Sequence, residues 1–186
     1  GRHVVAADAG QRHRAIRQPG AGVVRAAGAV IRHAWNHFAR QLQLLVEQQQ
    51  PTALIGSSLG GFYATALAER YRLPAVLINP AIWPERELQH FLGPLHNPYT
   101  GEDYRLTRQH MAELVAMRPP RLTPARYFLL LGTADEVLDW REAVRHYAGA
   151  RQLVRSGDDH RLQAWPQLLP GVARFVDDYY RRQAAR

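Results

Sequence analysis

The sequence contains no cysteine and no lysine, and it has no long apolar run. Without cysteine the chain has no disulfides, no thiolate metal site and no cysteine nucleophile, which fits a cytoplasmic protein. No apolar stretch approaches the roughly 20 residues that a membrane-spanning helix needs. Residues 1–35 contain no apolar core of a signal peptide. We therefore expect a cytoplasmic protein with no membrane partner.

Because lysine is absent, all 24 basic residues counted as Lys or Arg are arginine, and the formal charge is +8. A basic balance fits nucleic acid, an anionic lipid surface or an acidic substrate. The arginines are scattered, however, and form no basic stripe interleaved with aromatic residues. Their exclusive use indicates a coding bias at least as strongly as it indicates phosphate binding. We expect no nucleic-acid partner.

The rest of the composition is that of one globular unit. The chain has 186 residues, of which 46% are apolar, and this is enough to bury a sizeable core. The sequence has no internal repeat and no segment that reads as a linker. It therefore predicts a single domain over residues 1–186.

From about residue 52 onward, apolar runs alternate with helix-forming segments. Residues 75–78 and 127–131 are continuously apolar, which is typical of strands buried on both faces of a parallel sheet. The alternation predicts an open parallel α/β sheet. The expected strands are 3–7, 52–55, 75–78, 127–131 and 152–155; the expected helices are 61–71, 107–117, 139–148, 171–181 just after Pro170, and one from an N-cap at Asn36 to Pro51.

The second expected strand ends in Gly56-Ser57-Ser58-Leu59-Gly60. This is a G-x-S-x-G pattern between a strand and a helix, the context of a nucleophile elbow with Ser58 at its centre. An abrupt strand-to-helix turn strains its central residue and requires small neighbours. The amide of Leu59, at the start of the helix, would donate to a developing oxyanion.

Two other interpretations of this segment compete with the nucleophile. A purely structural turn explains many occurrences of the five-residue pattern. A phosphate-binding loop is less consistent, because the chain contains neither G-x-x-x-x-G-K-[ST] nor G-x-G-x-x-G. The strand before the pattern and the helix after it favour the nucleophile.

A serine hydroxyl needs a base, and in this arrangement an acid and then a histidine follow the serine along the chain. His160 lies in a small polar loop after the strand at 152–155, where sheet folds of this type place reactive groups. His146 falls inside an expected helix, where a packing or surface role is favoured. The remaining downstream histidines lie in the irregular segment 82–120 and either line a pocket or face water: His90, His96 and His110.

The acid is expected on the loop after the strand at 127–131. Asp135 is the preferred candidate because its loop leaves the strand end directly, with Glu136 and Asp139 in reserve. It would accept a hydrogen bond from one imidazole nitrogen and fix the tautomer. Alternatively, Asp135 or Asp139 only caps the helix at 139–148. Two acidic residues stand too close to His160 in sequence and are interpreted as loop-forming: Asp158 and Asp159.

Longer stretches carry a family resemblance over roughly residues 52–178. GSSLGGFYAT, LPAVLINPA, NPYTGEDY and GTADEVLDWREAVRHYAGARQ resemble the YqiA-like bacterial esterases of the α/β-hydrolase superfamily. NPYTGEDY and DEVLDWREAV are far more discriminating than the elbow. The resemblance implies an α/β-hydrolase-like three-layer sandwich with a mostly parallel sheet and a short lid insert.

The same resemblance implies a reaction. It makes Ser58 the nucleophile, Asp135 the acid and His160 the base of a triad. The implied activity is hydrolysis of small-molecule carboxylic esters or thioesters through an acyl-enzyme, with no metal and no organic cofactor. The lid insert at 82–120 would then cover the elbow, and its aromatic residues would either line an acyl pocket or close a small core: Trp83, Phe91, Tyr99 and Tyr104, beside Leu92.

The chain departs from the family pattern in two places. The family opens with a strand and a His-Gly-Phe-type turn that supplies a second oxyanion donor, and nothing in residues 1–51 matches it. The segment Asp8-Ala9-Gly10 is the nearest substitute. Arg161 also stands where the family has a small apolar residue. Losing one oxyanion donor typically costs about 10²–10³ in turnover, so the alternative function is a weak or inactive hydrolase-fold protein that binds a ligand or partner.

Overall fold

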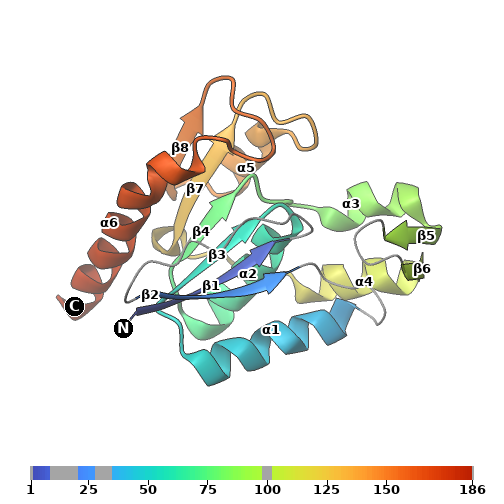
Figure 1. Cartoon of the computed structure of the whole chain (residues 1–186), viewed down its shortest axis with the longest axis horizontal. Helices are drawn as coiled ribbons and strands as arrows, with labels where there is room; N and C mark the ends of the chain where they lie inside the picture. The colour runs from blue at the N-terminus through green and yellow to red at the C-terminus, as the bar shows by residue number, and fades with distance from the viewer. Residues whose placement is uncertain (1, 9–20, 28–34, 98–101, 186) are drawn as a thin grey trace.

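A parallel sheet forms the centre of the molecule. The computed structural model describes residues 2–8, 21–27, 35–97 and 102–185 (Figure 1). Six strands in these ranges pair in parallel in the order β2-β1-β3-β4-β7-β8. The predicted fold class, an open parallel α/β sheet, is confirmed. The strands are β1 (Arg2–Asp8), β2 (Ala21–Ala27), β3 (Ala53–Ser57), β4 (Ala75–Ile78), β7 (Tyr127–Gly132) and β8 (Arg151–Arg155).

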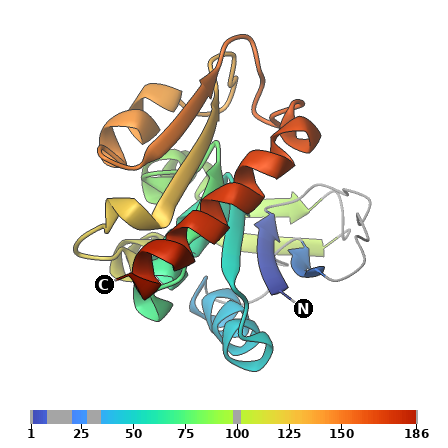
Figure 2. The same ribbon diagram turned by 90° about the vertical axis from the view of Figure 1, so that its left-hand side faces the viewer.

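Helices cover both faces of this sheet and make three layers. Figures 1 and 2 show α6 against one face, with α1 and α2 on the other. No helix in the described ranges is long and apolar enough to cross a bilayer. The helices are α1 (Trp35–Gln49), α2 (Leu59–Tyr71), α3 (Pro84–Leu88), α4 (Arg108–Met117), α5 (Trp140–His146) and α6 (Trp165–Ala184), with the 3₁₀ turns η1 (Gln89–Phe91) and η2 (Pro124–Arg126).

The continuously apolar runs are explained by burial on both sides of the sheet. Alternate residues of β4 and β7 point to opposite faces. Leu77 and Leu129 join the core under α1, α2, α4 and α5, whereas Val76 and Phe128 join the core under α6. Phe128 packs against Phe175 of α6 in a tilted arrangement, with ring centroids 5.5 Å apart. Each such side chain contributes about 1.5–3 kcal/mol when fully buried, so a polar residue would be costly on either face.

The strand order reverses at β1, which lies between β2 and β3. The chain passes from β1 to its neighbour on one side and then crosses to β3 on the other, where Asp8 pairs with Ser57. Connections that diverge from the carboxyl ends of two neighbouring strands leave a crevice between them. The first residue after β3, Ser58, therefore lies at the crevice of this sheet.

Two N-terminal expectations needed correction. Strand β2 was not among the expected strands, and its pairing with β1 rather than its composition defines it. Helix α1 begins at Trp35, so Asn36 lies inside the helix and is not its N-cap. The expected end before Pro51 is confirmed, since α1 stops at Gln49.

The last helix is longer than we expected. It begins at Trp165 and runs through Pro170, although a proline inside a helix removes a hydrogen bond and costs about 3 kcal/mol. The cost is offset by burial, because α6 places Val172, Phe175 and Val176 in the core of its face of the sheet. Tertiary packing thus overrides the local signal of the proline.

The segment 82–120 is more regular than its composition indicated. It contains α3, η1, an antiparallel hairpin of β5 (Gly93–Asn97) and β6 (Glu102–Leu106), and then α4. Helix α4 is close to the expected 107–117 because Thr107 caps it. The Thr107 hydroxyl accepts from the amide of His110, and Nδ1 of His110 accepts from the amide of Thr107 at 3.1 Å. This reciprocal pair satisfies two amides at the start of the helix.

Candidate active site

Ser58 occupies a strained turn between β3 and α2. Its backbone has φ 54° and ψ −126°, a conformation that costs a non-glycine residue on the order of 1–3 kcal/mol. Three backbone hydrogen bonds hold it: its amide donates to the carbonyl of Ile78 at 3.0 Å, and its carbonyl accepts from Gly61 at 2.9 Å and Ala81 at 3.0 Å. Ser58 is the N-cap of α2, yet its side chain makes no capping hydrogen bond. Its hydroxyl is therefore not consumed by the helix, as it would be in an ordinary serine cap.

Gly56 of the motif and Gly61 just after it are required by close approach. A Cβ on Gly56 would overlap the carbonyl of Gly60 and lie 2.8 Å from the Cβ of Ala64. A Cβ on Gly61 would lie 2.6 Å from the Cβ of Pro80. The helix thus packs directly against both β3 and the end of β4, which is the local reason for glycine at positions 56 and 61.

Leu59 begins α2, so its amide belongs to the first turn, where helix N–H groups have no acceptor within the helix. This is the position expected of an oxyanion donor, reinforced by the positive end of the helix dipole. The substitute second donor, Asp8-Ala9-Gly10, begins where β1 ends at Asp8. Ala9 and Gly10 lie outside the described residues.

The structure brings Asp135 and His160 together. Nδ1 of His160 lies 2.9 Å from each carboxylate oxygen of Asp135. The Asp135 side chain is 1% exposed and that of His160 is 15% exposed. The amides of Val137 and Leu138 also donate to Oδ1 of Asp135 at 2.8 and 2.9 Å. The amides of its own loop thus hold the Asp135 carboxylate in place, facing the imidazole of His160.

The pKa values of this pair move in opposite directions. Burial raises the pKa of Asp135, but the hydrogen bonds from His160, Leu138 and Val137 outweigh it and hold the pKa below the ordinary value. The hydrogen bond to Asp135 raises the pKa of His160, against the effect of burial, and the nearby charges of Glu136 and Asp159 add to the rise. An ionised Asp135 therefore stabilises the imidazolium that a general base must form.

The other acidic candidates have different partners. Asp139 caps α5 by accepting from the amide of Arg141 at 3.0 Å, and Glu136 accepts from the amide of His160 at 3.1 Å. Asp158 and Asp159 help to form the loop, as we expected. The carbonyl of Asp158 accepts from Ala134, and the carboxylate of Asp159 accepts from Arg161 at 3.0 Å.

Three of the four residues predicted to bind substrate lie in the described ranges, and their surroundings differ. Trp83 packs against the core on the side of the sheet that α1 and α2 cover. The guanidinium groups of Arg86 and Arg118 lie 4.8 and 4.4 Å from its ring centroid. Phe91 is 57% exposed at the end of η1. Tyr104 is half-buried on β6, and Tyr99 lies outside the described residues.

Two further histidines in the described ranges, His146 and His96, have structural partners. His146 packs edge-on against Trp83 and Tyr147, with ring centroids 5.2 and 4.9 Å away. Its pKa is lowered by burial and by the charge of Arg118. His96 pairs with Asp103 across the exposed hairpin at 2.8 Å. Within the described ranges, no three His, Asp or Glu side chains gather as a metal ion would require.

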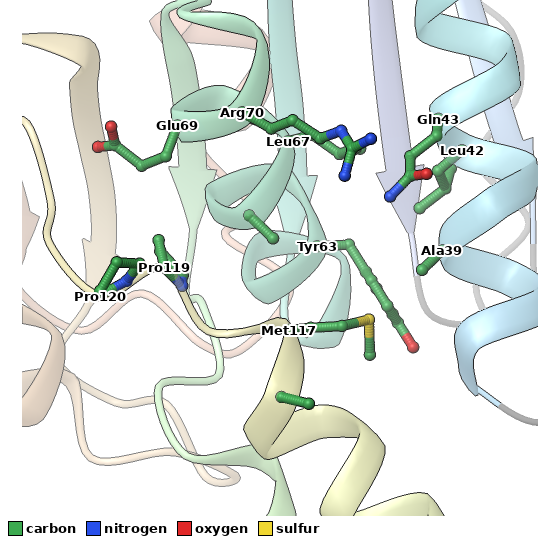
Figure 3. A pocket seen from close by; sticks show the side chains of 12 residues that line it. Ala39, Leu42, Gln43, Tyr63, Leu67, Glu69, Arg70, Met117, Pro119 and Pro120 are labelled. Atoms are coloured by element: carbon green, nitrogen blue, oxygen red, sulfur yellow. The ribbon is translucent and has the colours of Figure 1, made fainter.

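A separate cavity of about 440 Å³ lies over the outer face of α2, between α1 and the end of α4. Figure 3 shows Tyr63 and Met117 near one end of it and Arg70 at the other. None of the residues predicted to act in catalysis or substrate binding lines it. Its one carboxylate is already engaged, because Glu69 accepts from Thr123 and from the hydroxyl of Tyr127 at 2.7 Å.

Asn79 is a polar residue of this region that the sequence did not single out. It follows β4 directly and is 2% exposed. Its side chain connects the end of β7 with the loop after β8. It accepts a hydrogen bond from the amide of Gly132 and donates to the carbonyls of Asp159 and His160. The available signal was an asparagine immediately after a buried strand.

Comparison with solved structures shows the same fold. The esterase domain of a Rhodothermus marinus protein is 19% identical, with TM-score 0.60, over 87% of this chain and 79% of that one. Est1E from Butyrivibrio proteoclasticus with ferulic acid bound is 14% identical, with TM-score 0.67, over 100% and 90%. The carboxylesterase CesB from Bacillus subtilis is 14% identical, with TM-score 0.52, over 94% and 83%.

A family model identifies the chain more directly. The model of the uncharacterised protein family UPF0227 matches residues 10–177. The match therefore begins well before residue 52, where the motifs that carry the resemblance start. Together with the α/β-hydrolase fold and the YqiA-like motifs, it shows that the chain belongs to UPF0227, the family of the YqiA-like esterases.

Proposed function

We propose that this protein is a serine hydrolase that cleaves carboxylic esters or thioesters through an acyl-enzyme. The observation that carries the proposal is the hydrogen bond between His160 and the buried carboxylate of Asp135, in a fold whose crevice holds Ser58 on a strained turn. Hydrogen bonds of residues 78–81 with both Ser58 and His160 support the proximity of Ser58 to the base. Ser58 bonds to Ile78 and Ala81, and Asn79 bonds to the carbonyl of His160 at 3.0 Å.

In the proposed reaction, Nε2 of His160 takes the hydroxyl proton as Ser58 Oγ forms a bond to the substrate carbonyl carbon. Asp135 holds the proton on Nδ1 and stabilises the imidazolium. The oxyanion that forms is stabilised by the amide of Leu59. When the carbon–oxygen or carbon–sulfur bond breaks, His160 returns the proton to the leaving alcohol or thiol. Water then repeats the sequence on the acyl-enzyme and releases the acid.

The test is hydrolysis of p-nitrophenyl acetate, butyrate and longer acyl esters, with a feruloyl ester added because one structural neighbour holds ferulic acid. The parent protein and Ser58→Ala would be compared. We expect release by the parent and at least a ~10⁴-fold lower rate in Ser58→Ala, since a triad acts as a unit. A fluorophosphonate probe should label the parent alone. Equal release by both proteins would overturn the proposal.

A second candidate is a hydrolase-fold protein that binds a ligand or partner without turnover. The sequence feature that favours it is the absence of a His-Gly-Phe-type turn from residues 1–51. This candidate predicts cooperative thermal unfolding, no labelling by the probe, and no difference between the parent and Ser58→Ala.

A further inference from the structure

We propose that Asn79 is a positioning residue that connects two loops: the acid loop after β7 (residues 133–139), which carries Asp135, and the base loop after β8 (residues 156–164), which carries His160. By holding these loops together, Asn79 keeps the imidazole of His160 in position relative to Asp135 and Ser58. The inference rests on the proposed function and extends it to a residue that touches neither the substrate nor the reacting atoms.

Asn79 is placed for this by the end of β4. Its amide donates to the carbonyl of Leu130 in β7 at 3.1 Å, and its backbone adopts φ 39°, a left-handed conformation that asparagine tolerates better than most residues. Pro80 follows and stiffens the exit from the strand. The side chain, 2% exposed, is thereby aimed between the two loops that follow β7 and β8.

The side-chain amide uses its donors and its acceptor on different loops. Nδ2 donates to the carbonyls of Asp159 and His160, both at 3.0 Å. Oδ1 accepts from the amide of Gly132 at 2.9 Å. An amide offers two N–H donors and an acceptor oxygen, so this pattern fits asparagine and fits neither a carboxylate nor an apolar residue of the same size.

The loops that it joins carry the predicted acid and base. Gly132 ends β7, three residues before Asp135, and the carbonyl that Asn79 holds belongs to His160 itself. Ile78, just before Asn79, and Ala81, two residues after it, bond to the backbone of Ser58. One short segment after β4 therefore sets the position of all three groups relative to one another. A misplacement of about 1 Å can cost on the order of 10² in rate.

The charged groups around the imidazole are Asp135, Glu136 and Asp159, and they favour its protonated form. Without the bonds from Asn79 the backbone of Asp159 and His160 can shift, and the hydrogen bond from Nδ1 of His160 to Asp135 then lengthens. The pKa of His160 then falls toward its ordinary value. A merely structural role for Asn79 would lower the fraction of folded protein and leave this pKa unchanged in the molecules that remain folded.

The experiment compares the parent, Asn79→Ala and Thr65→Val. Thr65 is the matched control, since it is also buried and its hydroxyl donates to the carbonyl of Gly61 at 2.8 Å and bonds to the hydroxyl of Tyr147 at 2.7 Å, partners that belong to neither loop. All proteins are assayed well below their unfolding temperatures with p-nitrophenyl butyrate across pH. We expect Asn79→Ala to lower kcat about 10–100-fold with KM within ~3-fold, and to move the acid limb of kcat/KM to lower pH. Thr65→Val should lower only the unfolding temperature.

Asn79→Asp serves as a second variant if Asn79→Ala does not fold. It keeps the shape and the acceptor for Gly132 but loses both donors to the base loop, and we expect a similar loss of kcat. An unchanged kcat in either folded variant would overturn the positioning role while leaving the proposed function intact. If the parent shows no turnover that depends on Ser58, the proposed function fails instead. NMR titration of the His160 ring in parent and Asn79→Ala then decides the positioning role, and an unchanged pKa would refute it.

Discussion

The carboxyl edge of the sheet and the insert at 82–120 are built in different ways. At the edge, the loops after β7 and β8 are joined by backbone and side-chain hydrogen bonds, such as Thr133 to the carbonyl of Arg155 at 2.9 Å and Gly157 to the hydroxyl of Thr133 at 2.9 Å. The insert instead presents an exposed hairpin and the 57% exposed Phe91.

The two regions meet two different requirements of catalysis, exact placement of the reacting groups and adaptable contact with the substrate. Groups that move protons must be held to fractions of an ångström, and buried hydrogen bonds between loops on a rigid sheet achieve that. Groups that contact a variable part of a substrate tolerate mobility. We therefore expect substitutions at the edge to act on kcat and on folding, whereas substitutions of exposed residues in the insert act on KM.

The largest expected effect comes from Asp135→Asn. The change keeps the shape but removes the charge and favours the wrong tautomer of His160, and we expect kcat for p-nitrophenyl butyrate to fall by about 10⁴. Asp139→Asn is the control, because asparagine caps a helix as well as aspartate does and Asp139 only caps α5. A comparable loss in both variants would contradict the assignment of Asp135 as the acid.

The next effect concerns the packing of the two loops. A Cβ on Gly132 would overlap the carbonyl of Asp158 and lie 2.9 Å from that of Asp159. Gly132→Ala should therefore cost about 1–3 kcal/mol of unfolding free energy, the usual range for overpacking, and lower kcat as well. In urea unfolding, Gly171→Ala should stabilise the protein by about 0.5–1 kcal/mol, because nothing lies within 4 Å of its new Cβ. If Gly132→Ala leaves stability unchanged, the loops are looser than their contacts indicate.

The pH dependence tests the edge without a substitution. The pKa of His160 is raised above 6.5, chiefly by Asp135, and the general base must be neutral to accept a proton. The acid limb of kcat/KM should thus have an apparent pKa above 6.5. Asp135 has a lowered pKa and stays ionised across this range. A limb at or below the ordinary histidine value would mean that the Asp135–His160 bond does not form in the working enzyme.

The same contrast explains what the sequence predicted. The elbow is a local motif, so Gly56, Ser58 and Gly60 could be interpreted from a few neighbouring residues. The choice of Asp135 and His160 rested on the rule that reactive groups lie in loops after parallel strands. In the structure, Nδ1 of His160 lies 2.9 Å from Oδ1 of Asp135. Strand β2, the hairpin of β5 and β6, and the passage of α6 through Pro170 depend on tertiary partners, which local periodicity does not record.

Asn79 was missed for a related reason. An asparagine before a proline at a strand end is an ordinary turn signal, and nothing local distinguishes it from one that holds two distant loops. Its partners, Gly132 and His160, are 53 and 81 residues away in sequence. Only the assembled sheet brings them within reach of one side chain.

The smallest effect is expected in the insert, from Phe91→Ala. Phe91 is 57% exposed, and surface substitutions usually change stability by less than about 0.5 kcal/mol. If Phe91 contacts the acyl chain, KM for long-chain p-nitrophenyl esters should rise a few-fold, while KM for the acetate and every kcat stay as in the parent. Val115→Ala, at a similarly exposed position of α4, is the control for loss of apolar surface. A fall in kcat for the acetate would show that the insert helps to hold the catalytic groups, and the separation between the two regions would then be wrong.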